Sequence, residues 1–436
     1  MKKTIFVFVI AAVLMLQPCC RRREVAPPTE GEIVKPGVEV FLTSHLDLVK
    51  GKKVGLITNP TGVDRNLCST AALLAQNPAV ELVALYGPEH GIRGNAQAGE
   101  YVPYYFDDKF NIPVFSLYGQ SFKPDPGMFK DIDTYMRSFD TTEAGKIPEG
   151  AMIQDVDVLV FDIQDVGTRV YTYIATMAYA MQACAESGIE FIVLDRPNPI
   201  NGIDLEGPIL EYPEFSSFVG LYPVPLRHGM TAGELALMFN EEFFEKKAEL
   251  TVIPMKGWKR SMWFDETRLP WILPSPNVPT LETAMVYPGQ VLFEGTNASE
   301  GRGTTRPFEL LGAPWIDGNE LARRLRSLGL NGVGFREAWF RPSFSKFDGE
   351  RCGGVQVHVT DREVFRPLAT ALHIIKTIRD LYPGQFSFHP DYFDRIIGNS
   401  RVREAIEKGA SVEEILAGFE DGLRKFAAER KPYLLY

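Results

Sequence analysis

The N-terminal two thirds of the chain alternates short apolar runs with helical patterns. The runs that predict buried strands lie at 53–58, 80–86, 156–161 and 189–194. The stretches that predict helices between them lie at 69–78 and 170–187. Strands that are apolar on both faces and alternate with helices form a parallel sheet covered by helices on both sides. The pattern therefore predicts an α/β protein with a Rossmann-like parallel sheet.

Each of these four runs ends in a polar cluster that contains Gly or Pro. The carboxyl ends of parallel strands lie at one edge of a sheet, and open α/β sheets bind their ligands there. We therefore expect the polar residues after the four runs to share one crevice: Asn59, Glu89, His90, Asp162, Asp165, Asp195 and Arg196. Each of them, taken alone, also fits a helix cap or a turn residue.

The C-terminal third of the chain has a different pattern. A segment at about 258–290 is rich in Trp and Pro and predicts a linker region. Beyond it, helical patterns and one alternating strand predict a smaller α+β domain, at 319–329, 354–360, 369–382 and 411–430. We therefore place a Rossmann-like catalytic domain at 38–270 and a smaller C-terminal domain, which completes a cleft, at 271–436.

The first residues predict export. Lys2 and Lys3 precede an apolar run at 5–16, which suits the core of a signal peptide and is too short to span a bilayer. Cys19 stands where a bacterial lipoprotein carries its lipid, with Cys20 as the alternative. We expect a signal peptide at 1–18, a charged and Pro-rich tether at 19–37, and a periplasmic or membrane-anchored location. Simple secretion and an uncleaved anchor are the alternatives.

Composition narrows the classes of function. The formal net charge is −10 and the body of the chain has no Lys/Arg block, so we expect no nucleic-acid partner. The chain has no G-x-G-x-x-G after the first strand and no P-loop motif, and we expect no cofactor. Cys68, Cys184 and Cys352 are too widely spaced for a disulfide framework, and Cys184 is predicted to be a buried apolar residue.

Glu89 is the first candidate for catalysis. It lies in Gly-Pro-Glu-His-Gly at 87–91, where the glycines allow a sharp turn and a close approach to a ligand. A carboxyl group at the end of an apolar strand is partly removed from water, which suits it to general-acid chemistry near neutral pH. A structural role as a helix cap is the alternative.

Glycoside hydrolysis usually needs a second carboxyl group, ~5 Å away for retention or ~6.5–9.5 Å away for inversion. The candidates are Glu300, Glu294, Asp165 and Asp162, and the residues alone do not separate them. Arginines in or near the same clusters indicate an anionic group on the substrate: Arg93, Arg169, Arg227, Arg302 and Arg306.

A metal site is the main rival to this reading of the carboxylates. His90, His228, Asp162 and Asp165 are of the types that bind transition metals. The chain has only six His, however, and neither an H-E-x-x-H nor an H-x-H motif. We therefore predict no metal.

Six motifs, taken in order, resemble one known family. They are GPEHGIRG (87–94), FDIQDVGTR (161–169), LDRPNP (194–199), RHGMT (227–231), PSPN (274–277) and EGTN (294–297) with SEGRGT (299–304). Together they are similar to the motifs of the exo-β-N-acetylmuramidase NamZ family of glycoside hydrolases. The resemblance covers the chain from about residue 38 to its C-terminus.

The resemblance implies a Rossmann-like domain, a smaller C-terminal domain and a cleft between them. It implies removal of terminal N-acetylmuramic acid from the non-reducing end of peptidoglycan fragments in cell-wall turnover, with Glu89 as the favoured catalytic residue. We expect His90 and either Glu300 or Asp165 to complete the catalytic set. The lactyl carboxylate of muramic acid would account for arginines in the cleft. The residues expected to bind the substrate are Asn59, Arg93, Asp162, Arg169, Arg196, His228, Asn277, Glu294, Asn297, Arg302 and Arg306.

Two other functions remain open at this point. One is a lipoprotein that binds muropeptides without cleaving them. The other is a metal-dependent amidase or esterase that acts on the peptide or lactyl part of the substrate.

Overall fold

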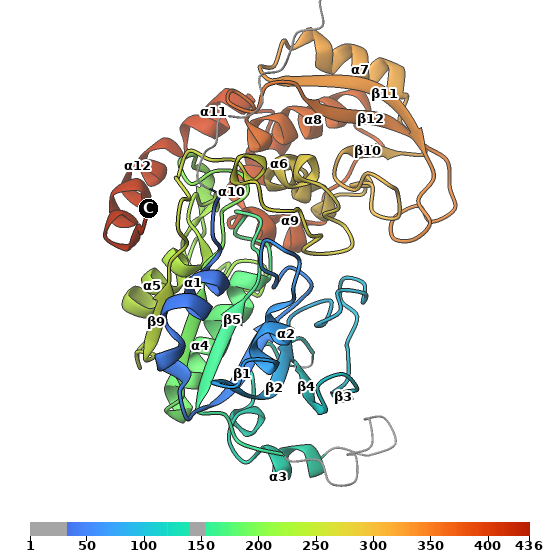
Figure 1. The fold of residues 1–436 in the computed structure, drawn as a ribbon. Helices are drawn as coiled ribbons and strands as arrows, with labels where there is room; N and C mark the ends of the chain where they lie inside the picture. The colour runs from blue at the N-terminus through green and yellow to red at the C-terminus, as the bar shows by residue number, and fades with distance from the viewer. Residues whose placement is uncertain (1–32, 120, 139–152) are drawn as a thin grey trace, which may run out of the picture. The chain divides into compact units, whose positions relative to one another are not determined.

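The computed structural model describes residues 33–119, 121–138 and 153–436. The chain from Ile33 to Tyr436 forms one compact unit (Figure 1). The predicted signal peptide, the lipidation site at Cys19 and most of the predicted tether lie outside the described residues. In the described part of the chain, no helix combines the length and the hydropathy needed to cross a bilayer.

A seven-stranded sheet lies at the centre of the N-terminal part. Its strands are β1 (Lys53–Thr58), β2 (Glu81–Gly87), β3 (Tyr105–Asp107), β4 (Ile112–Ser116), β5 (Val158–Asp162), β6 (Glu190–Leu194) and β9 (Leu250–Ile253). They are arranged in the order β3-β4-β2-β1-β5-β6-β9, and all neighbours are parallel except β3 and β4 at one edge. The predicted Rossmann-like sheet is thus confirmed.

Helices cover both faces of this sheet, because successive side chains of each strand point to opposite sides. The helices are α1 (Gly37–Ser44) and α2 (Thr70–Ala75) on one face, and α3 (Ile132–Arg137), α4 (Tyr173–Ser187) and α5 (Ala232–Phe243) on the other. In β5, Val160 packs in the core beneath α1 and α2, whereas Phe161 packs in the core beneath α4. Cys184 of α4 is fully buried, as predicted.

The C-terminal part is a smaller α+β region, which is also confirmed. Its antiparallel sheet has the order β10-β12-β11, with β10 (Leu310–Ala313), β11 (Val333–Phe340) and β12 (Cys352–Val359). Its helices are α6 (Leu281–Gln290), α7 (Gly318–Ser327), α8 (Pro367–Leu381), α9 (Pro390–Ile397), α10 (Arg401–Glu407), α11 (Val412–Ala417) and α12 (Glu420–Glu429). A ribbon of β7 (Glu206–Ile209) and β8 (Pro225–Arg227) lies between β6 and β9 in the sequence.

The two parts share one hydrophobic core. The same cluster of buried residues includes Phe161 of β5, Met177 of α4, Leu292 and Ile375 of α8. The packing therefore continues across the predicted domain boundary at 270/271, which stays a prediction.

Two segments differ from the sequence predictions. The prediction of a linker at 258–290 is wrong for the C-terminal end of this segment. Residues from Thr283 to Gln290 are buried and belong to helix α6. The single terminal helix predicted at 411–430 is two helices, α11 and α12, separated at Gly418. A glycine inside a helix costs about 1 kcal/mol relative to alanine and favours a break there. The end of the predicted tether packs on the body, where Val34 contacts Met255 and Trp258.

Arg169 ties the edge of the large sheet to the end of α9. Its Nη1 donates to the carbonyls of Pro208 and Val224, both at 2.9 Å, and its Nη2 donates to those of Ile396 and Ile397 at 2.9 and 2.8 Å. Burial lowers the pKa of Arg169 to about 9, which still leaves the guanidinium charged at neutral pH. The last carbonyls of a helix have no partner within it and carry partial negative charge, so a cation is favourable there.

Replacement of Arg169 by Met should loosen this connection. Four buried carbonyl groups lose their donors, and we expect a loss of about 2–4 kcal/mol in the free energy of unfolding. Urea unfolding measures the loss, and hydrogen exchange should show faster opening of α9. The matched control is Arg323→Met, at an exposed arginine that pairs with Glu320 on the surface of α7. Equal urea midpoints for the two variants would show that the four bonds contribute little.

Asp195 follows β6 and is buried among donors. Its Oδ1 accepts from the Gly233 amide at 2.8 Å, and its Oδ2 accepts from the hydroxyls of Thr231 and Tyr436 at 2.7 and 2.8 Å. Burial nevertheless raises the pKa of Asp195 from 3.8 to about 6. Because the folded state holds this proton more tightly than the unfolded state, its stabilising contribution is present below pH 3.8 and is lost as the pH rises towards 6.

Asp195→Asn should remove this pH dependence. Relative to the parent chain, the variant should gain on the order of 2 kcal/mol in stability between pH 4 and pH 7, since one pKa unit corresponds to about 1.4 kcal/mol. Urea midpoints at several pH values in that range test it, with Asp108→Asn as an exposed control. A stability difference that does not change with pH would contradict the buried, protonated Asp195.

Candidate active site

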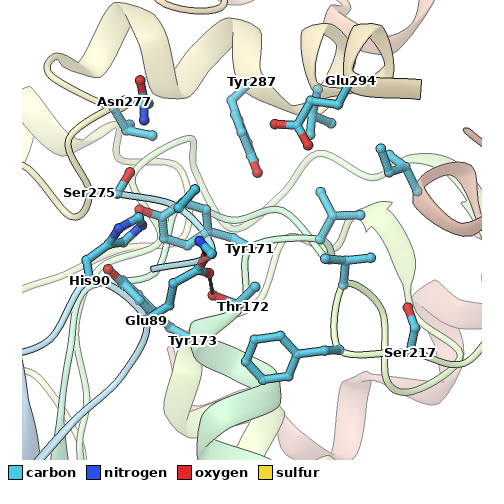
Figure 2. Close-up of a pocket in the computed structure, with 18 of the residues that line it drawn as sticks. Glu89, His90, Tyr171, Thr172, Tyr173, Ser217, Ser275, Asn277, Tyr287 and Glu294 are labelled. Atoms are coloured by element: carbon cyan, nitrogen blue, oxygen red, sulfur yellow. Dashed lines mark hydrogen bonds between the residues drawn. The ribbon is translucent and has the colours of Figure 1, made fainter. Parts of the chain in front are cut away.

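A pocket of about 450 Å³ lies between the carboxyl end of β2 and the segment that begins at α6. In Figure 2, Glu89, His90 and Tyr173 point into it from one side, and Asn277, Tyr287 and Glu294 point into it from the other. The further polar residues that line it are Tyr118, Tyr171, Thr172, Ser217, Ser275, Arg302, Tyr392 and Arg395. A concave site with few, convergent polar groups is the usual form of a small-molecule site.

The turn after β2 places Glu89 at the pocket. His90 and Gly91 both have left-handed backbone conformations, with φ of 73° and 71°, so the chain reverses directly after the carboxylate. A Cβ at Gly87 would lie 2.9 Å from the amide nitrogen of Ile92, which is why a glycine stands there. Glu89 is half-buried; its Oε1 accepts from the Gly99 amide at 3.0 Å and its Oε2 accepts from the Thr172 hydroxyl at 2.9 Å.

His90 is a neutral imidazole beside this carboxylate. Burial lowers its pKa, although the Glu89 carboxylate opposes the shift. Its Nδ1 lies 2.8 Å from the Ala96 carbonyl, which accepts only from a protonated nitrogen. That bond assigns the proton of the neutral ring to Nδ1 and leaves Nε2 as a free acceptor.

The opposite wall carries a second carboxylate, Glu294, in the 3₁₀ helix η4 (Val291–Gly295). Its Oε1 accepts from Arg302 Nη2 at 2.6 Å and from Nε at 3.2 Å, and its Oε2 accepts from the Tyr392 hydroxyl at 3.0 Å. Burial opposes the charge of Arg302, but the carboxylates of Glu294 and Glu300 outweigh it and raise the pKa of the guanidinium. Glu294 is therefore held in place at the pocket wall by a cation and a hydroxyl donor.

Buried aromatic and amide groups complete the polar part of the pocket. The rings of Tyr171 and Tyr173 meet edge to face at 4.9 Å, and those of Tyr171 and Tyr287 at 5.7 Å. Burial and then the Glu89 charge raise the pKa of Tyr173, and burial raises that of Tyr287, so both are hydroxyl donors at neutral pH. Asn277 is buried, and its Nδ2 has no hydrogen-bond partner among the described residues. Such a buried donor calls for a ligand or a water.

One end of the pocket is aromatic. The rings of Phe122 and Phe218 stack at 4.1 Å with an angle of 8°, and Tyr118 lies 5.7 Å from Phe218. All three residues line the pocket. Flat apolar faces next to hydrogen-bonding groups suit an amphipathic ring such as a sugar.

Of the residues predicted from the sequence, the pocket brings together five: Glu89, His90, Asn277, Glu294 and Arg302. Of the four candidates for the second carboxylate, only Glu294 lines it, and the two expected in the catalytic set, Glu300 and Asp165, do not. Glu300 is buried behind Arg302, where its Oε2 binds Lys346 Nζ at 3.0 Å. Asp165 is also buried; its Oδ2 accepts from the Gly167 amide at 2.7 Å and lies 3.5 Å from His228 Nε2.

The remaining polar residues at the sheet edge bind one another instead of sharing the crevice. Asp162 is fully buried and accepts from Arg196 Nε at 2.5 Å and Nη2 at 2.9 Å. Asn59 accepts from the backbone and side chain of Thr61 at 2.9 and 2.5 Å. The expectation of one shared crevice is therefore met only by the residues that follow β2.

The other predicted substrate-binding residues also lie outside the pocket lining. Arg93 pairs with Asp107, and Arg306 pairs with Glu309. Arg169 is buried among carbonyl groups, as described above, and His228 is fully buried. Asn297 joins two loops through the backbone of Gln385 and Ser387. Within the described residues, no three His, Cys, Asp or Glu side chains converge on a possible metal position.

Sequence reasoning missed the tyrosines and Arg395. Tyr171 and Tyr173 closely follow the motif at 161–169, and this position beside a motif identifies them as candidates for the site. Tyr392 and Arg395 lie on α9, more than a hundred residues after the other pocket residues of the first part, in a segment without a recognised motif. Only the fold brings them to the pocket.

Comparison with known proteins agrees with the motifs. The family model described as exo-β-N-acetylmuramidase NamZ, N-terminal, matches residues 54–146 and 137–282, and the corresponding C-terminal model matches residues 285–436. A peptidoglycan β-N-acetylmuramidase NamZ from Bacillus subtilis (strain 168) is 51% identical over 442 residues, which cover 100% of both chains.

Two crystal structures of DUF1343 family proteins from Bacteroides fragilis have the same fold. One superposes with a TM-score of 0.81 at 38% identity, and the other with a TM-score of 0.72 at 33% identity. Each alignment covers 92% of this chain and 99% of the other. The chain thus belongs to the exo-β-N-acetylmuramidase NamZ family.

Proposed function

We propose that this protein is an exo-acting glycosidase that releases terminal N-acetylmuramic acid from the non-reducing end of peptidoglycan fragments. The observation that carries the proposal is the pocket in which Glu89 and Glu294 stand on opposite walls, in a chain of the NamZ family. Two carboxyl groups that flank one sugar are the usual requirement for glycosidic cleavage. The buried hydroxyls of Tyr171 and Tyr287 and the amide of Asn277 supply donors for the sugar, whereas the hydroxyl of Tyr173 donates to the Pro274 carbonyl.

Glu89 is the general acid in this proposal. The Gly99 amide can only donate, so Oε1 is fixed as an acceptor. The Thr172 hydroxyl donates to Oε2 at 2.9 Å, so the two donors together fix the orientation of the carboxyl group. As the general acid, Glu89 passes its proton to the glycosidic oxygen as the bond to the sugar breaks.

Glu294 is the second carboxylate in this proposal, in place of Glu300 or Asp165. Arg302 and Tyr392 bind its two oxygens and fix its orientation, which suits a group that either attacks the sugar carbon or activates a water. His90 supports Glu89 from the same turn, and its free Nε2 is available to a substrate hydroxyl or a water.

We also propose that the protein is exported and held at a membrane through a lipid on Cys19. The apolar run at 5–16 and the cysteine that follows it support this proposal. Peptidoglycan lies outside the cytoplasmic membrane, so export would bring the pocket to its substrate.

Product identification tests the activity. The protein is incubated with the disaccharide of N-acetylmuramic acid and N-acetylglucosamine, and the release of free N-acetylmuramic acid is expected, with or without a chelator. Stoichiometric binding without product would favour a muropeptide-binding protein. Cleavage outside the glycosidic bond, lost with a chelator, would favour a metal-dependent amidase or esterase.

Glu89→Gln should lower kcat for the disaccharide by about 10²–10⁴-fold, because the leaving sugar needs a proton. A nitrophenyl β-muramide has a leaving group that departs as an anion, so its loss should be much smaller. Steady-state kinetics with the two substrates measure the difference. The control is Glu100→Gln, at an exposed carboxylate that does not line the pocket. Equal losses for the two substrates would remove the acid role from Glu89.

Glu294→Ala should lower kcat for both substrates alike, by about 10²-fold or more, because the lost group acts on the sugar rather than on the leaving group. Azide in the assay should restore part of the nitrophenyl muramide turnover by entering the space left by the carboxylate. The control is Glu282→Ala, at an exposed carboxylate at the start of α6. Unchanged kcat in Glu294→Ala would return the second role to another group.

A further inference from the structure

The positive charges at the pocket are not equivalent. Arg302 lines the pocket but is bound to Glu294 at 2.6 Å and lies 3.7 Å from Glu300, so its charge is already balanced. His90 is neutral because burial lowers its pKa. Arg395 also lines the pocket, and no hydrogen bond or ion pair engages its guanidinium among the described residues. It is therefore the unbalanced cation of this site.

Acidic residues near Arg395 are committed elsewhere or stand apart from it. Asp394 is buried and binds Arg403 Nη2 at 2.7 Å and Nε at 2.9 Å. Asp391 and Glu214 line the same neighbouring groove as Arg395 without pairing with it. An exposed guanidinium with free donors at a pocket wall is well shaped to take a carboxylate in a bidentate contact.

The fold places Arg395 firmly. It lies one helical turn after Tyr392 on α9, so the two side chains project from the same face of the helix. Tyr392 is fixed by its bond to Glu294, and the end of α9 is fixed by the bonds from Arg169 to Ile396 and Ile397. The carboxyl end of a helix also favours a cation in its last turn. The backbone of Arg395 is thus held beside the sugar-binding part of the pocket, and its guanidinium remains free to bind a ligand.

Arg395 also stands where the pocket meets a second hollow. It lines the pocket together with Ser217, and both residues line an adjacent groove of about 410 Å³. A substituent that extends from a sugar ring in the pocket towards this groove passes the guanidinium.

We propose that Arg395 is the specificity-determining residue that binds the carboxylate of the lactyl group on muramic acid. The proposal rests on the proposed function. The lactyl group distinguishes a muramide from a glucosaminide, because N-acetylglucosamine lacks the lactyl ether. Arg302, in contrast, binds and orients Glu294 rather than the substrate anion.

The test compares two chromogenic substrates, the nitrophenyl β-glycosides of N-acetylmuramic acid and of N-acetylglucosamine. Arg395→Met should lower kcat/KM for the muramide by about 10- to 100-fold, mainly through KM, and leave that for the glucosaminide unchanged. Arg395→Lys should retain an intermediate value, since it keeps the charge but not the fork. The control is Arg401→Met, at an exposed arginine that begins α10 and pairs with Glu211.

Two results would overturn the proposal. One is an equal loss for both glycosides in Arg395→Met, which would indicate damage to the pocket as a whole. The other is an unchanged preference for the muramide. Calorimetric binding of free N-acetylmuramic acid and N-acetylglucosamine separates this question from catalysis. If the parent chain cleaves neither glycoside but binds the muramic sugar in preference, and Arg395→Met loses that preference, the proposed hydrolysis fails while the carboxylate site stands.

Discussion

The four hydrogen bonds of Arg169 hold the two walls of the pocket in one geometry. They link the loop after β5 with the β7–β8 ribbon and with the last carbonyls of α9. Because α9 carries Tyr392, and Tyr392 orients Glu294, the position of one carboxylate depends on a cation that never contacts the pocket. Neutral carbonyl groups bind this cation, so the link needs no buried carboxylate as a counterion.

The polar residues at the carboxyl edge of the sheet differ in whether other segments cover them. β1 and β5 lie in the middle of the sheet, and their strand ends are covered by other segments, so Asn59 and Asp162 must find partners within the protein. β2 lies on the other side of β1, and its turn leaves Glu89 half-buried at an open hollow. The crevice at the carboxyl ends of the strands thus exists, but of the polar residues predicted to share it only those after β2 line it.

The sequence patterns predict those features of the fold and the site that depend on residues close together in the chain. The four strands and the Glu89 turn followed from apolar runs and the residues that end them. The pairing of charges did not follow, because Glu300 finds Lys346 and Glu294 finds Tyr392 only after the C-terminal part folds back. The helix α6 was missed for a local reason: Pro288 and Gly289 near its end resemble a linker, yet Pro288 is tolerated inside the helix.

The number of arginines near a predicted site therefore does not show how many anions the site can bind. Arg93, Arg196, Arg302 and Arg306 each face a carboxylate of the same chain, and Arg169 faces carbonyls. A guanidinium that is already paired orients its partner, but it has little charge left for a ligand. The ability to bind an anion lies with the unpaired cation, and that residue can be identified only once every other charge has been assigned its partner. In this proposal, specificity for a charged sugar depends on the cation that the fold leaves unpaired at the pocket.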